Sequence, residues 1–223
     1  MIVISVHVPK CAGDALRLAL ENAVGRANIC YDYEESPFNP TKPVNTDPNY
    51  FSRFHAGSYD FLNGKRLVHG HFHISKYKAL APATRIVVLR EPVERLISHY
   101  FFWKHHPRKN HPLHDYMLDA NLSLEEFAEI PSVRRFYSGV FFKNVDMETF
   151  DAIGKFSEIP AFLSAFQHLN GLTLTLPVAN ANPESNYSAL KKDLLNDTKR
   201  MNHLHSLFSE DTEFYQRWAG KGC

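Results

Sequence analysis

Three polar residues with distinct chemistry each follow an apolar run of the chain. Lys10 comes after a β-favouring start, His71 follows a short apolar run that begins at Leu67, and Arg90 directly follows a continuous β-branched run that begins at Arg85. Lysine and arginine bind phosphate or sulfate, and a neutral histidine can accept a proton near pH 7. If the three runs are parallel strands, their carboxyl ends meet at one edge of the sheet, where ligands bind. The sequence therefore predicts an anion-binding site with a nearby base.

The loop around Lys10 has the composition of an anion site. Ala12 and Gly13 are small enough to let the backbone approach a ligand closely, and an apolar helix-like run follows them. The free N–H groups of such a helix point back toward the loop. The same residues are equally consistent with an ordinary strand-to-helix turn that carries a surface lysine.

The second cationic stretch begins at Arg90 and is followed by a helix with Pro92 at its first position. The guanidinium fork suits a phosphate, and the Ser98 hydroxyl, about two turns along the helix, could add a hydrogen bond. Alternatively, Arg90 forms a salt bridge with Glu91 or Glu94, and Ser98 is a plain exposed serine. We expect Arg95 and Ser98 to lie on the polar side of this helix.

Two other chemistries are compatible with the sequence. His69, His71 and His73 alternate, so on a strand they would share a face and could hold a metal. Cys11 lies beside Lys10 near a helix N-terminus, a setting that can lower a thiol pKa and activate it as a nucleophile.

The elements that must position these residues alternate between strands and helices, which predicts one α/β domain over residues 1–223 with a central, mainly parallel sheet flanked by helices. Further strands are expected near residues 151–156 and 172–178, and residues 30–50 are expected to be loop. A capping box from Ser123 to Glu126 predicts a helix start. Helices are expected at residues 113–118, 124–130, 159–169 and 187–218, the last with Leu190, Leu194, Leu195, Met201, Leu204, Leu207 and Phe208 as core contacts.

Bulk properties exclude several classes. The net charge of +1 argues against a nucleic-acid partner or an anionic membrane surface, so any anion site must be local. No apolar run reaches the length of about 20 residues that a membrane span needs. Three cysteines form no disulfide framework, and Met1 leads into the first strand without a basic leader. We expect a cytoplasmic protein.

Two of these motifs together resemble a known family. His7 to Leu16, HVPKCAGDAL, resembles the 5′-phosphosulfate loop HIPKTAGTSL of the carbohydrate sulfotransferases, and Leu89 to Tyr100, LREPVERLISHY, resembles their 3′-phosphate motif LRDPVERLLSHY. His69-Gly70-His71 is similar to the HGH segment of the heparan-sulfate 2-O-sulfotransferase branch. Glu210 to Tyr215 is a weaker match to the family's closing helix.

The resemblance implies a P-loop-like fold and 3′-phosphoadenosine 5′-phosphosulfate (PAPS) as co-substrate, with no metal. Lys10 would contact the transferring sulfuryl group, and His71 would take the proton of a hydroxyl acceptor, which the resemblance implies is a sugar or glycan hydroxyl. The 5′-phosphate would bind the loop of Pro9, Lys10, Cys11, Ala12, Gly13, Asp14 and Ala15. Arg90 and Ser98 would hold the 3′-phosphate.

The chain departs from the family at three loop positions. Asp14 and Ala15 replace hydroxyl residues, and Cys11 replaces threonine. The carboxylate of Asp14 beside an anion motivates a second hypothesis, a catalytically inactive protein that binds PAPS or its product 3′,5′-adenosine bisphosphate (PAP). A P-loop kinase is disfavoured because the Walker pattern ending in Gly-Lys-Ser/Thr is absent. The acceptor and the oligomeric state are not specified, although residues 30–60 and 103–118 are candidates for acceptor contacts.

Overall fold

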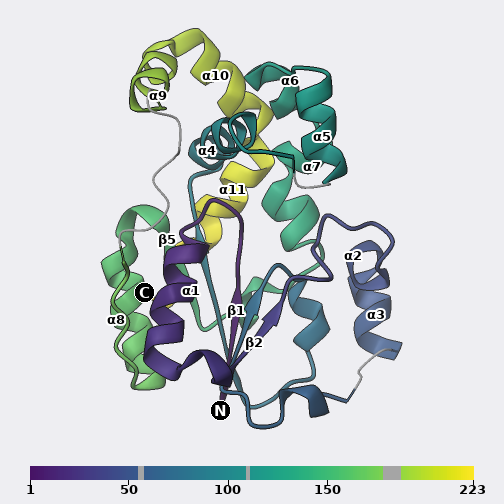
Figure 1. Cartoon of the computed structure of the whole chain (residues 1–223), viewed down its shortest axis with the longest axis vertical. Coiled ribbons are helices and arrows are strands. Elements are labelled where there is room, and N and C mark those ends of the chain that lie inside the picture. The colour runs from purple at the N-terminus through teal and green to yellow at the C-terminus, as the bar shows by residue number, and fades with distance from the viewer. Residues whose placement is uncertain (55–57, 109–110, 178–186) are drawn as a thin grey trace.

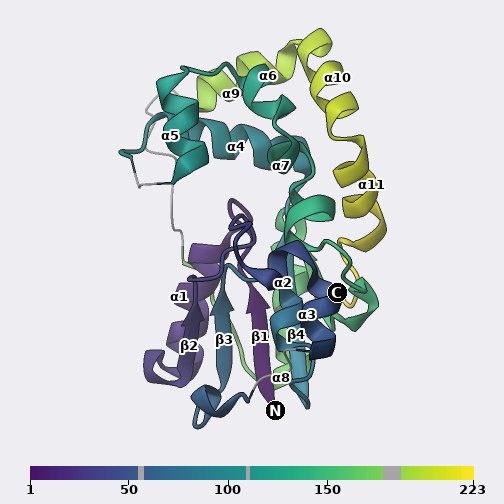
Figure 2. The ribbon, with the colours of Figure 1, turned by 90° about the vertical axis from the view of Figure 1, so that its right-hand side faces the viewer.

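A single parallel sheet forms the centre of the protein. The computed structural model describes residues 1–54, 58–108, 111–177 and 187–223. Five strands lie in the order β2-β3-β1-β4-β5 and every neighbouring pair is parallel. Figure 1 shows the whole chain, and Figure 2 shows β2, β3, β1 and β4 side by side in this order. The strands are β1 (Ile2–Val6), β2 (Ile29–Asp32), β3 (Leu67–Gly70), β4 (Ala83–Leu89) and β5 (Ala152–Lys155). The α/β class with a parallel sheet is confirmed.

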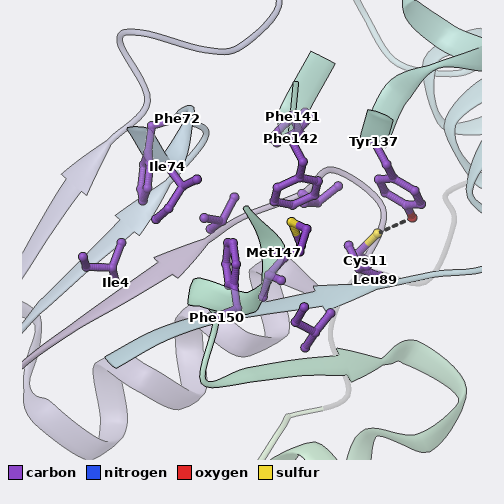
Figure 3. Close-up of a cluster of buried hydrophobic side chains, with 14 of the residues drawn as sticks. Ile4, Cys11, Phe72, Ile74, Leu89, Tyr137, Phe141, Phe142, Met147 and Phe150 are labelled. Carbon is purple, nitrogen blue, oxygen red and sulfur yellow. Dashed lines mark hydrogen bonds between the residues drawn. The ribbon is translucent and has the colours of Figure 1, made fainter. Parts of the chain in front are cut away.

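Both faces of the sheet are buried, which explains why the strands are almost continuously apolar. Successive side chains alternate between the faces. Val3 and Ile86 therefore join the core under α1 (Gly13–Val24) and α8 (Ile159–Asn170), whereas Ile4 and Val87 join a second core on the opposite face. The second core packs on side chains such as Phe72, Phe141 and Phe150 from three separate loops and turns (Figure 3). The protein is thus a three-layer sandwich.

A group of helices lies beyond the carboxyl ends of the strands (Figure 2). Its long central helix is α4 (Pro92–Lys104), which starts shortly after β4 and packs in a third hydrophobic cluster. The other helices of this cap are α5 (Pro112–Asp119), α6 (Leu124–Glu129), α7 (Pro131–Arg134), α9 (Tyr187–Asn196), α10 (Thr198–Leu207) and α11 (Ser209–Trp218). This placement encloses the sheet edge at which the sequence predicts the site.

Several expected elements are confirmed with small changes of boundary. The strand predicted near residues 151–156 is β5, and the amphipathic helix predicted at 159–169 is α8. Ser123 accepts a hydrogen bond from the Glu126 N–H, while the Glu126 carboxylate accepts from the Ser123 N–H, so the capping box is formed. The tail is helical, as expected.

The expectation of a loop over residues 30–50 was wrong. Ile29–Asp32 is the edge strand β2, which pairs with β3, and α2 (Pro43–Thr46) and α3 (Pro48–Phe54) follow. The many prolines hid these elements, yet Pro43 and Pro48 occupy first helical positions, where no N–H is needed. Parallel pairing with β3 supplies the hydrogen bonds of β2. The short sequence of β2 does not by itself indicate a strand.

Three further expectations were wrong. Residues 172–177 form no strand, and Val178 lies outside the described residues. Arg95 and Ser98 are buried rather than on a polar face, because the cap surrounds the first turns of α4. Leu190 and Leu195, expected in the core, are 40% and 43% exposed. The sequence also did not indicate the π-helical turn η4 (Phe136–Phe141), whose aromatic residues enter the core.

No helix in the described ranges has both the length and the apolar character that crossing a bilayer requires.

Buried histidines should make folding stability depend on pH. Desolvation lowers the pKa of His69 to about 3 and those of His71 and His73 to about 4, and it also lowers the pKa of His7 and His99. The unfolded chain, with histidine pKa values near the ordinary value of about 6.5, binds more protons below that pH, so stability must fall as the pH is lowered. Each of these histidines should lower the free energy of unfolding by about 0.8 kcal/mol when the pH falls from about 7.5 to about 6.

Urea unfolding at the two pH values measures this loss. In the parent, His73 Nδ1 accepts a hydrogen bond from the Ser75 N–H. The variant His73→Asn keeps an acceptor for this N–H in its side-chain carbonyl. This variant should lose about 0.8 kcal/mol less than the parent, whereas His168→Gln at an exposed position should match the parent. An equal pH dependence in all three proteins would contradict the assignment.

Candidate functional site

The loop between β1 and α1, residues 9–12, has an unusual backbone and is here named the Lys10 loop. Lys10 and Ala12 have φ values of 68° and 64°, in the left-handed region that non-glycine residues rarely adopt. The loop leads directly into α1, whose first residue is Gly13, and the N-cap residue Ala12 has no polar side chain with which to cap the helix. The first N–H groups of α1 are thereby directed toward the carboxyl edge of the sheet. This is a backbone arrangement that suits an anion.

A close contact explains Gly13. A Cβ atom on this residue would lie 1.8 Å from a ring atom of His7. His7 follows β1, and its N–H donates to the Gly70 carbonyl at 2.7 Å. Because the ring of His7 occupies the space beside Gly13, the start of α1 can approach the sheet only with glycine at this position.

The side chain of Lys10 reaches across to α4. Its ammonium lies 3.7 Å from the ring centre of Phe102, a cation–π contact. Lys10 also contributes to lowering the pKa of His99, one turn earlier on α4, although desolvation is the largest cause. The side chain of the predicted catalytic lysine therefore extends from the loop to α4, where the Phe102 ring holds its ammonium.

Arg90 lies just past β4, the neighbour of β1 in the sheet. Its Nε is 3.4 Å from Glu94 Oε2, and its guanidinium carbon is 4.5 Å from the ring centre of Phe156. Glu94 also pairs with Lys191 at 3.7 Å. The salt bridge that the sequence left as an alternative for Arg90 is thus present.

A pocket of about 430 Å³ opens beside Arg90. Glu91, Glu94 and His205 give it polar groups, and Phe156 and Tyr215 contribute aromatic rings. Ser98 does not occur among the described residues that line it. Ser98 is buried on α4, with 8% of its surface exposed, whereas Arg90 is only partly buried. No described contact joins these two members of the predicted 3′-phosphate pair.

A further cation lies beneath the site. Arg95 is fully buried, with its guanidinium carbon 3.6 Å from the Phe136 ring centre and Nη1 3.3 Å from His99 Nδ1. Desolvation lowers the pKa of Arg95, and the Asp211 carboxylate is among the groups that oppose that effect. Lys10, Arg90 and Arg95 are thus three cationic side chains near this edge of the sheet, in a protein whose net charge is +1.

The predicted base belongs to a cluster of aromatic side chains. The ring of His71 lies 4.5 Å from His7 and 4.8 Å from Tyr33, measured between centres. Tyr33 also contacts His7, with its hydroxyl 3.1 Å from Nδ1. His71 Nε2 is buried and has no hydrogen-bond partner among the described residues. Burial lowers the pKa of His71 to about 4, so its imidazole is neutral near pH 7.

The neighbouring histidines have structural contacts. His69 is buried in β3, where Nδ1 lies 3.0 Å from the Ser5 hydroxyl. His73 Nε2 lies 3.0 Å from the Lys143 carbonyl, and its Nδ1 accepts from the Ser75 N–H. Both ring nitrogens of His73 are therefore engaged. His69 Nε2, like His71 Nε2, is buried without a partner among the described residues, but His69 lies within β3 whereas His71 follows its end.

The metal and thiol alternatives receive no support from the geometry. Within the described ranges, no group of three or more His, Cys, Asp or Glu side chains could hold a metal ion. Cys11 is 1% exposed, and burial raises its pKa instead of lowering it. Cys11 is a core residue beneath the loop.

Asp14 lies on the outer side of α1. Its carboxylate is 4.0 Å from Arg17 Nε, and 49% of its side chain is exposed. Arg17 also pairs with Glu21 at 2.8 Å. The Asp14 charge is therefore partly neutralised by Arg17 within the same helix turn.

Sequence reasoning missed Tyr137, which connects the two cationic segments. Its hydroxyl donates to the Arg90 carbonyl at 2.6 Å and accepts from the Arg90 N–H at 3.1 Å. Cys11 Sγ is 3.5 Å from the same oxygen (Figure 3). No local sequence signal marks this tyrosine, because its partners are 126 and 47 residues away.

Comparisons with known proteins give only distant likenesses. No family model matches the chain, and no curated protein matches it. Among solved structures, a sulfotransferase from Alicyclobacillus acidocaldarius is 15% identical, with a TM-score of 0.37 over 93% of this chain and 95% of that one. Mouse sulfotransferase SULT7A1 complexed with PAP is 13% identical, with a TM-score of 0.37 over 89% of this chain and 65% of that one. At these values the likeness does not by itself define an activity.

Two neighbouring substitutions in the loop should have different effects on stability. Gly13→Ala forces a Cβ into the ring of His7, so we expect a loss of about 1–3 kcal/mol in the free energy of unfolding. Ala12→Gly relieves a left-handed conformation that costs a non-glycine residue about 1–2 kcal/mol, offset by about 0.5–1 kcal/mol of unfolded-chain entropy. That variant should be as stable as the parent or slightly more stable. Urea denaturation measures both, and equal losses would contradict the loop geometry.

Proposed function

We propose that the protein is a sulfotransferase that moves a sulfuryl group from PAPS to a hydroxyl acceptor. The observation that carries this proposal is the strained Lys10 loop at the end of β1, with Arg90 at the end of the adjacent strand β4. A donor with phosphates at two positions needs two cationic sites of this kind. The motif resemblance of residues 7–16 and 89–100 to the carbohydrate sulfotransferases supports the same reading.

In the proposed mechanism, the chain supplies charge stabilisation and a base. The N–H groups at the start of α1, from Ala12 to Ala15, would bind the 5′-phosphate, and Arg90 with Ser98 would bind the 3′-phosphate. Lys10 would donate a hydrogen bond to the oxygen that bridges sulfur and phosphorus, where negative charge grows as that bond breaks. The donor-binding set would be Pro9, Lys10, Cys11, Ala12, Gly13, Asp14, Ala15, Arg90 and Ser98.

His71 is the proposed base for the acceptor hydroxyl. It is neutral at pH 7, with a buried nitrogen that has no described partner. Because Tyr33 packs against its ring, we expect the acceptor hydroxyl to pass beside Tyr33 to reach Nε2. We propose a sugar or glycan hydroxyl as the acceptor, on the strength of the motif resemblance. The reaction as proposed uses no metal.

The second candidate function is binding of PAP or PAPS without transfer. The observation that favours it is that both cations are engaged: Lys10 with the Phe102 ring and Arg90 with Glu94. Both contacts must be exchanged for contacts to the donor before transfer can occur.

Removal of the Lys10 ammonium should abolish transfer. Without its charge on the leaving oxygen, we expect Lys10→Ala to lower kcat by about 100-fold or more, the scale of one lost transition-state donor. Transfer of radiolabelled sulfate from PAPS to a panel of sugars, oligosaccharides and phenols measures this. The control is Lys104→Ala, which should retain activity. Lys104 is the last residue of α4, and its ammonium donates to Asn121. Tight calorimetric binding of PAP by the parent without transfer to any acceptor would favour the binding protein instead.

Arg90 and Glu94 should change donor affinity in opposite directions. Arg90→Ala should weaken PAP binding by about 1.5–3 kcal/mol, the value of a charged hydrogen bond. Glu94→Gln should strengthen it, because this substitution removes the carboxylate that competes for the guanidinium at 3.4 Å. Titration calorimetry with PAP tests both variants, with Arg26→Ala at an exposed position as the matched control. Equal affinity of the parent for PAP and for adenosine 5′-phosphosulfate would exclude the 3′-phosphate site.

A further inference from the structure

We propose that Tyr137 is a positioning residue whose hydroxyl holds the Lys10 loop and Arg90 at the spacing that a two-phosphate ligand requires. This inference rests on the proposed function, because it concerns how the donor site is held together. It assigns a role to a residue outside both motifs, on the turn η4.

The ladder between β1 and β4 ends before either cationic segment begins. Its last paired residues are Val6 and Val87. The sheet therefore does not fix the separation of the Lys10 loop from Arg90. Both polar backbone groups of Arg90 are instead satisfied by one side chain, since the Tyr137 hydroxyl donates to its carbonyl and accepts from its N–H.

The same hydroxyl also reaches the loop. The Tyr137 hydroxyl directs its proton at the Arg90 carbonyl, 2.6 Å away, and its oxygen lies 3.5 Å from Cys11 Sγ, whose thiol also lies 3.7 Å from the Pro9 carbonyl. Cys11 is the residue between Lys10 and Ala12, which have the two left-handed conformations. One phenol oxygen thus contacts both segments that the proposed donor would bridge.

The phenol is itself fixed from the opposite side. Asp211 of α11 is fully buried, and its carboxylate accepts from the Tyr137 N–H at 2.8 Å and from the Ser138 N–H at 2.9 Å. The Ser138 hydroxyl donates to the same carboxylate at 2.8 Å. These bonds hold η4 against α11, so Tyr137 cannot move with either segment. The chain from Asp211 through Tyr137 to Arg90 and Cys11 is a rigid spacer.

This arrangement has a measurable signature in ligand binding. A nucleotide with one phosphate needs only one half of the site, so the spacing of the halves does not affect it. PAP must engage both halves at once, and its second contact gains from the preset geometry. Loss of the spacer should therefore weaken PAP selectively.

Calorimetry with adenosine 5′-phosphate, adenosine 3′-phosphate and PAP tests the proposal. We expect Tyr137→Phe to weaken PAP by about tenfold and each mononucleotide by less than about threefold, because only the preset spacing is lost. Tyr77→Phe is the matched control: Tyr77 is also fully buried and donates to Asp32 at 2.6 Å. The control should leave all three affinities unchanged.

The outcomes separate this inference from the proposed function. An equal loss for all three nucleotides in Tyr137→Phe, or an unchanged affinity for PAP, would overturn the positioning role while the donor site stands. Failure of the parent protein to bind PAP would overturn the proposed function itself. If Tyr137→Phe does not fold, Cys11→Ala removes only the loop side of the contact and should lower PAP affinity selectively by about threefold; no selective loss would overturn the role.

Discussion

The site depends on the hydrogen bonds between the buried carboxylate of Asp211 and the first residues of the turn η4. Burial raises the pKa of Asp211, and hydrogen bonds from Tyr137 and Ser138 oppose that effect. A buried carboxylate is costly unless such donors satisfy it. Because the donors belong to consecutive residues, the carboxylate fixes the turn and places the Tyr137 hydroxyl between two strand ends. A contact far from the loop thereby holds the tyrosine that touches the loop.

Cations near the carboxyl edge of the sheet are packed against aromatic rings. Arg95 is buried against an aromatic ring and has its Nε without a partner among the described residues. Lys10 lies on a second ring, and the histidines nearby are neutral because burial lowers their pKa values. Aromatic faces can accommodate cations without neutralising them, unlike carboxylates. Two cations at this edge are thus packed against aromatic rings.

Part of the proposed donor site is built into the backbone, and part has to rearrange. The left-handed residues of the Lys10 loop and the start of α1 already have the backbone arrangement on which the proposed phosphate site is based. By contrast, Lys10 must leave Phe102, and Arg90 must exchange Glu94 for the ligand. Each exchange replaces one favourable contact with another, so the donor's affinity reflects only the difference between them. In the protein without ligand, these contacts hold the Lys10 and Arg90 side chains in defined positions. The contacting groups already exclude water from one side of each cation.

The sequence by itself determined the parallel α/β core and the position of Lys10, His71 and Arg90 after strands, because burial on both faces and strand-to-helix turns leave strong local patterns. It did not reveal β2, whose strand character comes from pairing with β3. Only the tertiary structure decided which groups touch: Arg90 with Glu94, Lys10 with Phe102, and Tyr137 with both cationic segments. These contacts join residues that share no sequence period, and they depend on how the helical cap meets the sheet edge. Local pattern therefore predicts the chemistry available, and long-range packing sets its geometry.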